Sequence, residues 1–242
     1  RYLGATYLNL FMIEDGLVKP YPFKNKYLTN YRGDVAHIFK GSNDDIWVCY
    51  TSGDIIRISA SGEKLFLNSG TYQARYVFED KNRQIWFGLA YGGIGYINKE
   101  DQIQLLNFPK IDFKSLFISS IRKLRNGNWL VTSFNKGILI IDRDGNPAYY
   151  DVKSGLPAIG VFSSVEDPDG TVWLTTQAGI TRYKNGKFGN IDFKSGLPEN
   201  SLFEFLPDQM GYVWFPSNRG LIRAQKQELN DYLDNKIDKI DW

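Results

Sequence analysis

Tryptophan recurs along the chain at nearly constant spacing, which is the mark of a repeat architecture. Trp47, Trp86, Trp129, Trp173 and Trp214 are separated by 39, 43, 44 and 41 residues. Periods in this range are typical of proteins in which each repeat forms one supersecondary unit and stacks on its neighbours. The spacing therefore predicts an array of similar units.

The residues around each tryptophan repeat as well. The aligned segments read DDIWVCYTSGDIIRI, RQIWFGLAYGGIGYI, NGNWLVTSFNKGILII, GTVWLTTQAGITRY and GYVWFPSNRGLIRA. Turn residues precede each tryptophan, a glycine follows six to eight residues later, and a second apolar run comes next. These glycines are Gly53, Gly92 or Gly93, Gly137, Gly179 and Gly220. Since a sugar-stacking residue would need no copy in every repeat, we assign the five tryptophans to the packing of the repeats.

Each period resolves into four short strands separated by turn signals. Around Trp173 we predict strands at about 160–166, 172–177, 180–184 and 187–193. Strands of this length and spacing indicate an all-β fold, and four strands per ~40 residues are typical of a β-propeller blade. We predict a β-propeller of four-stranded blades with about six repeat units. These units either close as a six-bladed ring or belong to a larger, seven-bladed propeller or a propeller array.

The repeat also predicts the domain organisation, a single β-propeller domain or fragment over 1–242. The predicted units are a partial blade at 1–30 and blades at 31–70, 71–113, 114–155, 156–197 and 198–242. The last blade carries an amphipathic stretch that predicts a short helical insert at about 226–238, and the following IDKIDW is expected to supply its fourth strand. Because the chain begins with Arg1 rather than Met, we expect a fragment or a processed domain.

Composition and charge exclude several classes of function. The 29 basic and 27 acidic residues give a net charge of +2 without a run of like charges, so we expect no nucleic-acid partner. No apolar stretch approaches the ~18 residues that span a bilayer, and we expect membrane attachment only through segments outside this chain. Cys49 is the single cysteine, which rules out an intrachain disulfide.

Few residues are suited to catalysis or metal binding. His37 is the single histidine, and His37 with Cys49 are too few ligands for a structural zinc site. The Asp-rich stretches at 167–170 and 142–146 fit hairpin turns better than calcium loops, since neither has Glu at the twelfth position. We therefore expect no metal, no cofactor and no catalysis in this chain. Paired carboxylates from different blades leave a glycan hydrolase or lyase open.

Two of the repeats carry a resemblance to a known family. The segments EDPDGTVWLTTQAGITRY (166–183) and LPDQMGYVWFPSNRGLIRA (206–224), with the Lys-Ser-Gly-Leu-Pro linkers at 153–157 and 194–198, resemble the two-component regulator propeller repeat. The resemblance implies a periplasmic sensor domain outside the inner membrane of a bacterium. In such receptors a transmembrane helix leads to a histidine kinase, hybrid regulator or diguanylate cyclase, and the resemblance implies a receptor dimer. Some similar proteins sense oligosaccharides.

In a propeller, the loops between strands two and three and the segments between blades lie on one face. Polar and aromatic side chains on such a face are candidates for a ligand site. The candidates are Tyr50, Tyr91, Asn135, Lys136, Lys153, Gln177, Lys194, Asn218 and Arg219. Three functions stay open: a sensor domain that binds a small molecule such as an oligosaccharide or mediates dimerisation, a protein-interaction propeller, and a propeller-fold glycan hydrolase or lyase.

Overall fold

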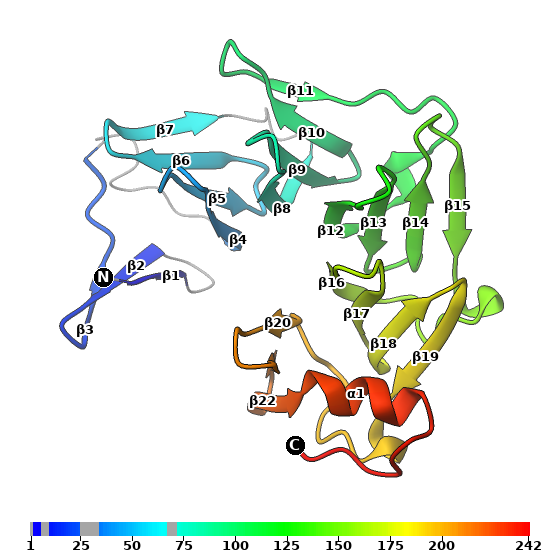
Figure 1. Cartoon of the computed structure of the whole chain (residues 1–242). Coiled ribbons are helices and arrows are strands. Elements are labelled where there is room, and N and C mark those ends of the chain that lie inside the picture. The colour runs from blue at the N-terminus through cyan, green and yellow to red at the C-terminus, as the bar shows by residue number, and fades with distance from the viewer. Residues whose placement is uncertain (1, 6–9, 25–33, 67–71) are drawn as a thin grey trace. The chain divides into compact units, whose positions relative to one another are not determined.

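The computed structural model describes residues 2–5, 10–24, 34–66 and 72–242. The chain divides into two compact units, Arg1–Ile121 and Arg122–Trp242, and each is described by itself. The described strands form six antiparallel sheets, in which the strands follow one another in chain order (Figure 1). Four of these sheets have four strands and two have three. The fold is an all-β propeller fold built from such blades, as the sequence predicts.

In the first unit, each strand pairs with the next along the chain. The first sheet consists of β1 (Tyr2–Ala5), β2 (Leu10–Glu14) and β3 (Leu17–Pro20). The second consists of β4 (Val35–Lys40), β5 (Ile46–Tyr50), β6 (Ile55–Ser59) and β7 (Gly62–Phe66). The third consists of β8 (Gln73–Glu79), β9 (Ile85–Ala90), β10 (Gly93–Ile97) and β11 (Ile103–Leu105), and is followed by the 3₁₀-helix η1 (Phe113–Ser115).

The same plan continues in the rest of the chain, and the boundary between the units falls inside β12. The fourth sheet consists of β12 (Ile118–Lys123), β13 (Trp129–Ser133), β14 (Ile138–Ile141) and β15 (Pro147–Tyr150), followed by η2 (Val152–Ser154). The fifth consists of β16 (Val161–Glu166), β17 (Val172–Thr176), β18 (Gly179–Lys184) and β19 (Lys187–Ile191), followed by η3 (Phe193–Ser195). The sixth consists of β20 (Leu206–Pro207), β21 (Tyr212–Ser217) and β22 (Gly220–Gln225), and the helix α1 (Lys226–Leu233) follows directly.

The repeating tryptophan fills the space inside and between blades. Trp173 is fully buried and its ring stacks on Phe205 at a centroid distance of 5.4 Å. Phe205 in turn packs edge-on against Phe215 of the next sheet at 5.3 Å. Burial of such rings removes ~150–250 Å² each from water. The tryptophan therefore joins one blade to the next, which explains why its position recurs.

An aspartate six residues before the tryptophan clamps the turn that precedes it. Its carboxylate accepts a hydrogen bond from the indole Nε1–H in three repeats. The pairs are Asp80–Trp86 at 3.0 Å, Asp167–Trp173 at 2.9 Å and Asp208–Trp214 at 2.9 Å. The other oxygen of Asp80 accepts the turn N–H groups of Asn82 and Gln84. One side chain thus satisfies both the ring and the turn.

The glycine after the loop between strands two and three has a positive φ, and at Gly137 and Gly179 it also lies against the end of the fourth strand. Gly137 and Gly179 have φ values of 71° and 106°, which disfavour other residues. A Cβ atom at Gly179 would collide with the carbonyl of Ile191, at the end of the fourth strand. At Gly220 a Cβ would meet nothing within 4 Å.

The sixth sheet corrects one expectation. IDKIDW was expected to form a fourth strand, but residues 236–242 form no strand. α1 begins directly after β22, within the range 226–238 where the sequence predicts a helix. Ile240 is buried with Leu229 in the core of this unit, and Trp242 packs against the same cluster. The terminal segment folds back onto the helix because its apolar side chains reach the core there.

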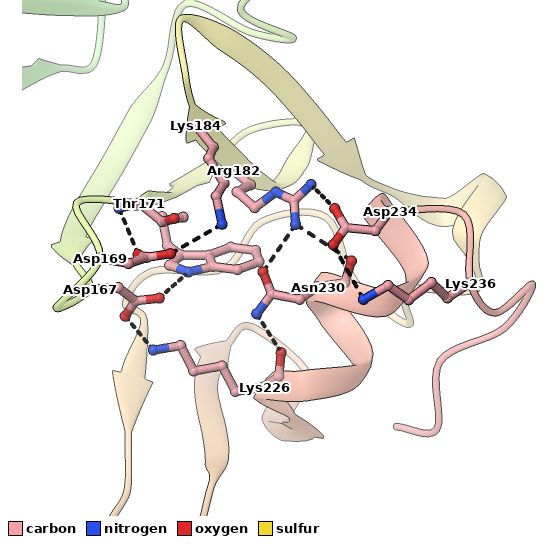
Figure 2. A network of polar contacts seen from close by, with 10 residues as sticks. Asp167, Asp169, Thr171, Arg182, Lys184, Lys226, Asn230, Asp234 and Lys236 are labelled. Atoms are coloured by element: carbon pink, nitrogen blue, oxygen red, sulfur yellow. Dashed lines mark hydrogen bonds and ion pairs between the residues drawn. The ribbon is translucent and has the colours of Figure 1, made fainter.

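Polar contacts hold α1 to the fifth sheet, and Figure 2 shows them together. Lys226 at the start of α1 pairs with Asp167. Arg182 of β18 donates to the side-chain oxygen of Asn230 at 3.0 Å and pairs with Asp234 at 2.6 Å. The repeated arginine of the Ile-x-Arg pattern is therefore part of the packing of this unit.

Candidate functional site

In the second unit, the loops between strands two and three lie against the chain that leads into the innermost strands. The N–H of Gln177, in the loop after β17, donates to the carbonyl of Gly160 at 2.9 Å. The N–H of Phe203 donates to the carbonyl of Pro216, near the end of β21, at 2.9 Å. The predicted loop residues and the first residues of the innermost strands therefore share one end of these blades.

Three phenylalanines from successive blades form a row at this end. The rings of Phe134 and Phe162 meet edge-on at a centroid distance of 5.9 Å, and those of Phe162 and Phe203 at 5.8 Å. Phe203 is 41% exposed, and the other two are half-buried. We call these three residues the aromatic row. Partly exposed rings joined by contacts across three blades make an apolar surface that a ligand can cover.

A β-bulge positions the middle ring of the row. The register between β16 and β17 shifts between Val161 and Ser163, so Phe162 has no partner across the strand pair. Bulges turn a side chain away from the regular alternation and are common next to functional sites. The innermost strands β4 and β8 have the same shift, at Ala36 and Arg75. The bulge is therefore a general feature of these blades, whereas a phenylalanine at the bulge is specific to β16.

Polar loop residues from the predicted set flank the row. Asn135 and Lys136 form an exposed turn after β13, and the hydroxyl of Ser133 accepts the N–H of each at 3.1 Å. The side chain of Gln177 lies so close over Gly160 that a Cβ there would collide with it. The amide group of Gln177 therefore lies against the backbone of Gly160, two residues before Phe162 in the chain.

The remaining predicted residues of this unit are exposed and mostly basic. Asn218 and Arg219 form the turn after β21, and Arg219 pairs with Glu199 at 3.4 Å while staying 74% exposed. Lys153 and Lys194 stand on η2 and η3. Together with Lys136, four cations therefore stand on loops at this end, although the structure records no contact that brings Lys153 or Lys194 to the aromatic row.

The first unit places its two predicted residues differently. Tyr50 is 3% exposed and belongs to an apolar cluster, and burial raises its pKa to about 12. Its side chain therefore packs in the core and does not face solvent. Tyr91 is 40% exposed, and its ring stacks on that of Phe117 at a centroid distance of 5.4 Å. The guanidinium of Arg75 lies over the ring of Phe117 at 5.0 Å. This pair is a second, smaller aromatic surface.

Sequence reasoning missed Phe162, Phe203 and Glu204. Both phenylalanines stand eleven residues before the tryptophan of their repeat, and that shared offset could have identified them. Glu204 follows Phe203, and burial raises the pKa of its carboxyl, with a hydrogen bond from Ser163 and the charge of Arg122 opposing the shift. Glu204 is thus a partly buried carboxyl directly next to Phe203 in the chain.

Within the described residues, no group of three or more His, Cys, Asp or Glu side chains is placed to hold a metal ion. The helices of the described ranges are also too short or too polar to cross a membrane.

The sequence matches no family model and no curated protein. Solved structures nevertheless share the fold. The chain is similar to the extracellular domain of a protein assigned as a hybrid two-component system of B. thetaiotaomicron, with 20% identity, a TM-score of 0.70 and coverage of 93% of this chain and 34% of that one. It is similar to virginiamycin B lyase from Staphylococcus aureus, with 19% identity, a TM-score of 0.64 and coverage of 88% and 76%.

A third similar structure is PorZ, a surface component of the type-IX secretion system of Porphyromonas gingivalis. It has 15% identity, a TM-score of 0.67 and coverage of 92% of this chain and 37% of that one. The chain thus spans about a third of the two-component domain and of PorZ, and about three quarters of the lyase. At these identities the likeness concerns the propeller fold, which is shared by sensor domains and lyases.

Proposed function

We propose that this chain is the ligand-sensing propeller domain of an extracytoplasmic receptor, and that it binds an oligosaccharide at the aromatic row without chemical change. The observation that carries the proposal is the partly exposed row of Phe134, Phe162 and Phe203 beside polar loop tips. Aromatic rings with nearby amides and hydroxyls suit ligands that have both apolar faces and hydroxyl edges. The likeness to an extracellular two-component domain supports the cellular setting.

The receptor setting includes a location and partners. We propose the periplasmic face of the inner membrane, with membrane attachment and an output module in other segments of the receptor, and self-association into a receptor dimer. These parts rest on the resemblance of the repeats at 166–183 and 206–224 to two-component regulator propellers and on the shared fold.

The binding test compares phenylalanines inside and outside the row. Isothermal titration with a panel of neutral and acidic oligosaccharides identifies a ligand, and Phe203→Ala is expected to weaken it by about tenfold or more, given the ~1–3 kcal/mol of a buried apolar contact. Phe193→Ala is the matched control, because Phe193 is 55% exposed on η3 and outside the row. Equal binding by both variants, or no binding across the panel, would contradict the proposal.

A second candidate function is a lyase, because the chain covers 76% of virginiamycin B lyase and Glu204 supplies a carboxyl of raised pKa beside the row. A carboxyl with such a pKa suits proton transfer. Incubating the protein with the bound oligosaccharide and analysing it by mass spectrometry separates the two functions. Product that disappears in Glu204→Gln would establish catalysis, and an unchanged ligand supports the sensor.

A further inference from the structure

A groove opens between the fourth and fifth sheets of the second unit, at the end opposite the aromatic row. It lies where the turn after β12 faces the turn after β16, and its volume is about 560 Å³. Ligand pockets commonly have volumes of about 300–1,000 Å³. None of the residues predicted as a ligand site lines it. We call it the turn-side groove.

The floor of the groove is apolar and its wall carries phenol groups. Leu124, Ile140 and Val172 form the floor, and Leu124 and Val172 are almost fully buried. Tyr150 and Tyr183 line the wall with their hydroxyl oxygens 3.4 Å apart. Burial and the neighbouring hydroxyl of Tyr150 raise the pKa of Tyr183 to about 12, so its hydroxyl keeps its proton at neutral pH.

One rim of the groove is fixed by hydrogen bonds within the fourth blade and from it to the fifth. The N–H of Arg125 donates to both carboxylate oxygens of Glu166, at 2.9 and 3.1 Å. The side-chain oxygen of Asn126 accepts the N–H of Asn128 at 3.0 Å, and Arg143 donates to the carbonyl of Asn126 at 2.7 Å. The backbone of this turn is therefore held, while the guanidinium of Arg125 stands at the exposed rim.

The facing rim is held by the network of Figure 2. Asp169 accepts the N–H of Thr171 at 2.9 Å and pairs with Lys184 at 3.1 Å. These contacts lower the pKa of Asp169 to about 2. Asp167, two residues earlier, is bonded to Trp173 and Lys226. The turn is thus rigid before any ligand arrives, which reduces the entropy cost of binding.

The chemistry of the groove indicates its ligand class. Both rim carboxylates accept hydrogen bonds from the protein, and Asp169 is also paired with Lys184. What the groove presents is an apolar floor, two phenol hydroxyls, and the side chains of Arg125, Asn126 and Asn128 at the rim. A pyranose ring has an apolar face and an edge of hydroxyl groups, and matches such a surface. We propose that the turn-side groove is a second binding site, which takes a sugar unit of a glycan.

This site is independent of the aromatic row, so the two proposals fail separately. Saturation-transfer NMR with mono- and disaccharides, among them xylobiose, cellobiose and a glucuronate-containing disaccharide, at about 10 mM detects weak binding. The test variant is Arg125→Ala/Tyr183→Phe, which removes polar atoms and keeps the backbone bond to Glu166 and the ring of Tyr183. It is expected to weaken binding by about tenfold, the effect of one or two hydrogen bonds.

Phe193→Ala is the matched control, because Phe193 is exposed on η3 and belongs to neither site, and Phe203→Ala reports separately on the aromatic row. Saccharide binding that is unchanged in Phe193→Ala and falls in Arg125→Ala/Tyr183→Phe supports the groove. Binding that falls only in Phe203→Ala overturns the groove and leaves the aromatic row standing. No saccharide signal at all, or a signal unchanged in the double variant, also overturns the groove. Unfolding of each variant in urea verifies that the blades are intact.

Discussion

At the scale of single residues, Trp173 shows what the repeat encodes. Its side chain is fully buried, stacks on Phe205 and donates to Asp167. We expect Trp173→Ala to lower the free energy of unfolding by about 3–5 kcal/mol, as is usual for a large buried ring. Urea denaturation followed by circular dichroism measures the change. A variant as stable as the wild type that had lost ligand binding would show instead that Trp173 contacts the ligand.

We expect the buried histidine His37 to make the folded protein less stable in acid. It lies in β4 with its ring 4.4 Å from that of Tyr76, and burial lowers its pKa to about 4. The unfolded chain takes up this proton near pH 6.5, so stability is lost as the pH falls from 6.5 towards 4. Between pH 7 and 4.5 this loss is about 2 kcal/mol.

Urea midpoints at the two pH values measure the loss in the wild type and in His37→Phe, which cannot titrate. We expect the midpoint of the variant to fall less than that of the wild type between pH 7 and 4.5. Parallel decreases in both proteins would show that other groups cause the acid sensitivity.

At the scale of elements, α1 replaces the missing fourth strand of the last sheet and is held by ion pairs of unequal burial. The Lys226–Asp167 pair is mostly covered, with side-chain exposures of 26% and 13%, whereas Lys236 is 60% exposed. We expect Lys226→Met to destabilise the protein by about 1 kcal/mol, because partial exposure screens the pair. Lys236→Met is the matched control, with no measurable change expected. Chemical denaturation of both variants measures this difference, and equal effects would contradict it.

At the scale of the whole molecule, Cys49 reports on folding because it is the single cysteine of the chain. It is fully buried, and burial raises the pKa of its thiol. Since the thiolate is the reactive form, we expect no modification by a thiol reagent at pH 8 in native conditions and rapid modification in denaturing urea. Labelling followed by mass spectrometry measures the rate. Fast labelling of the native protein would mean that β5 is accessible to solvent.

The blades could be predicted from the sequence because their signals are local. The four strands around Trp173 lie within two residues of the predicted ranges. The signals are alternating apolar residues, Asp-Gly turns and a glycine after the second strand. They act over fewer than fifty residues, so each repeat determines its own strands. The same connectivity predicts that the loops between strands two and three lie on one face of the blades.

The sites could not be predicted, because they depend on contacts between repeats. Phe134, Phe162 and Phe203 are separated by 28 and 41 residues in sequence, and only the stacking of their blades brings the rings together. Tyr50 is the last residue of β5, as Thr176 is of β17, and both side chains are buried at the strand end rather than placed in the loop.

The sequence by itself determined the repeat, its strands and its all-β class, since hydrogen bonding within a blade needs only neighbouring segments. The tertiary structure decided which side chains are exposed, where the turn-side groove opens, and that the terminal segment folds onto α1 instead of adding a strand. Those outcomes depend on burying apolar surface between segments far apart in the chain, and no local pattern records them.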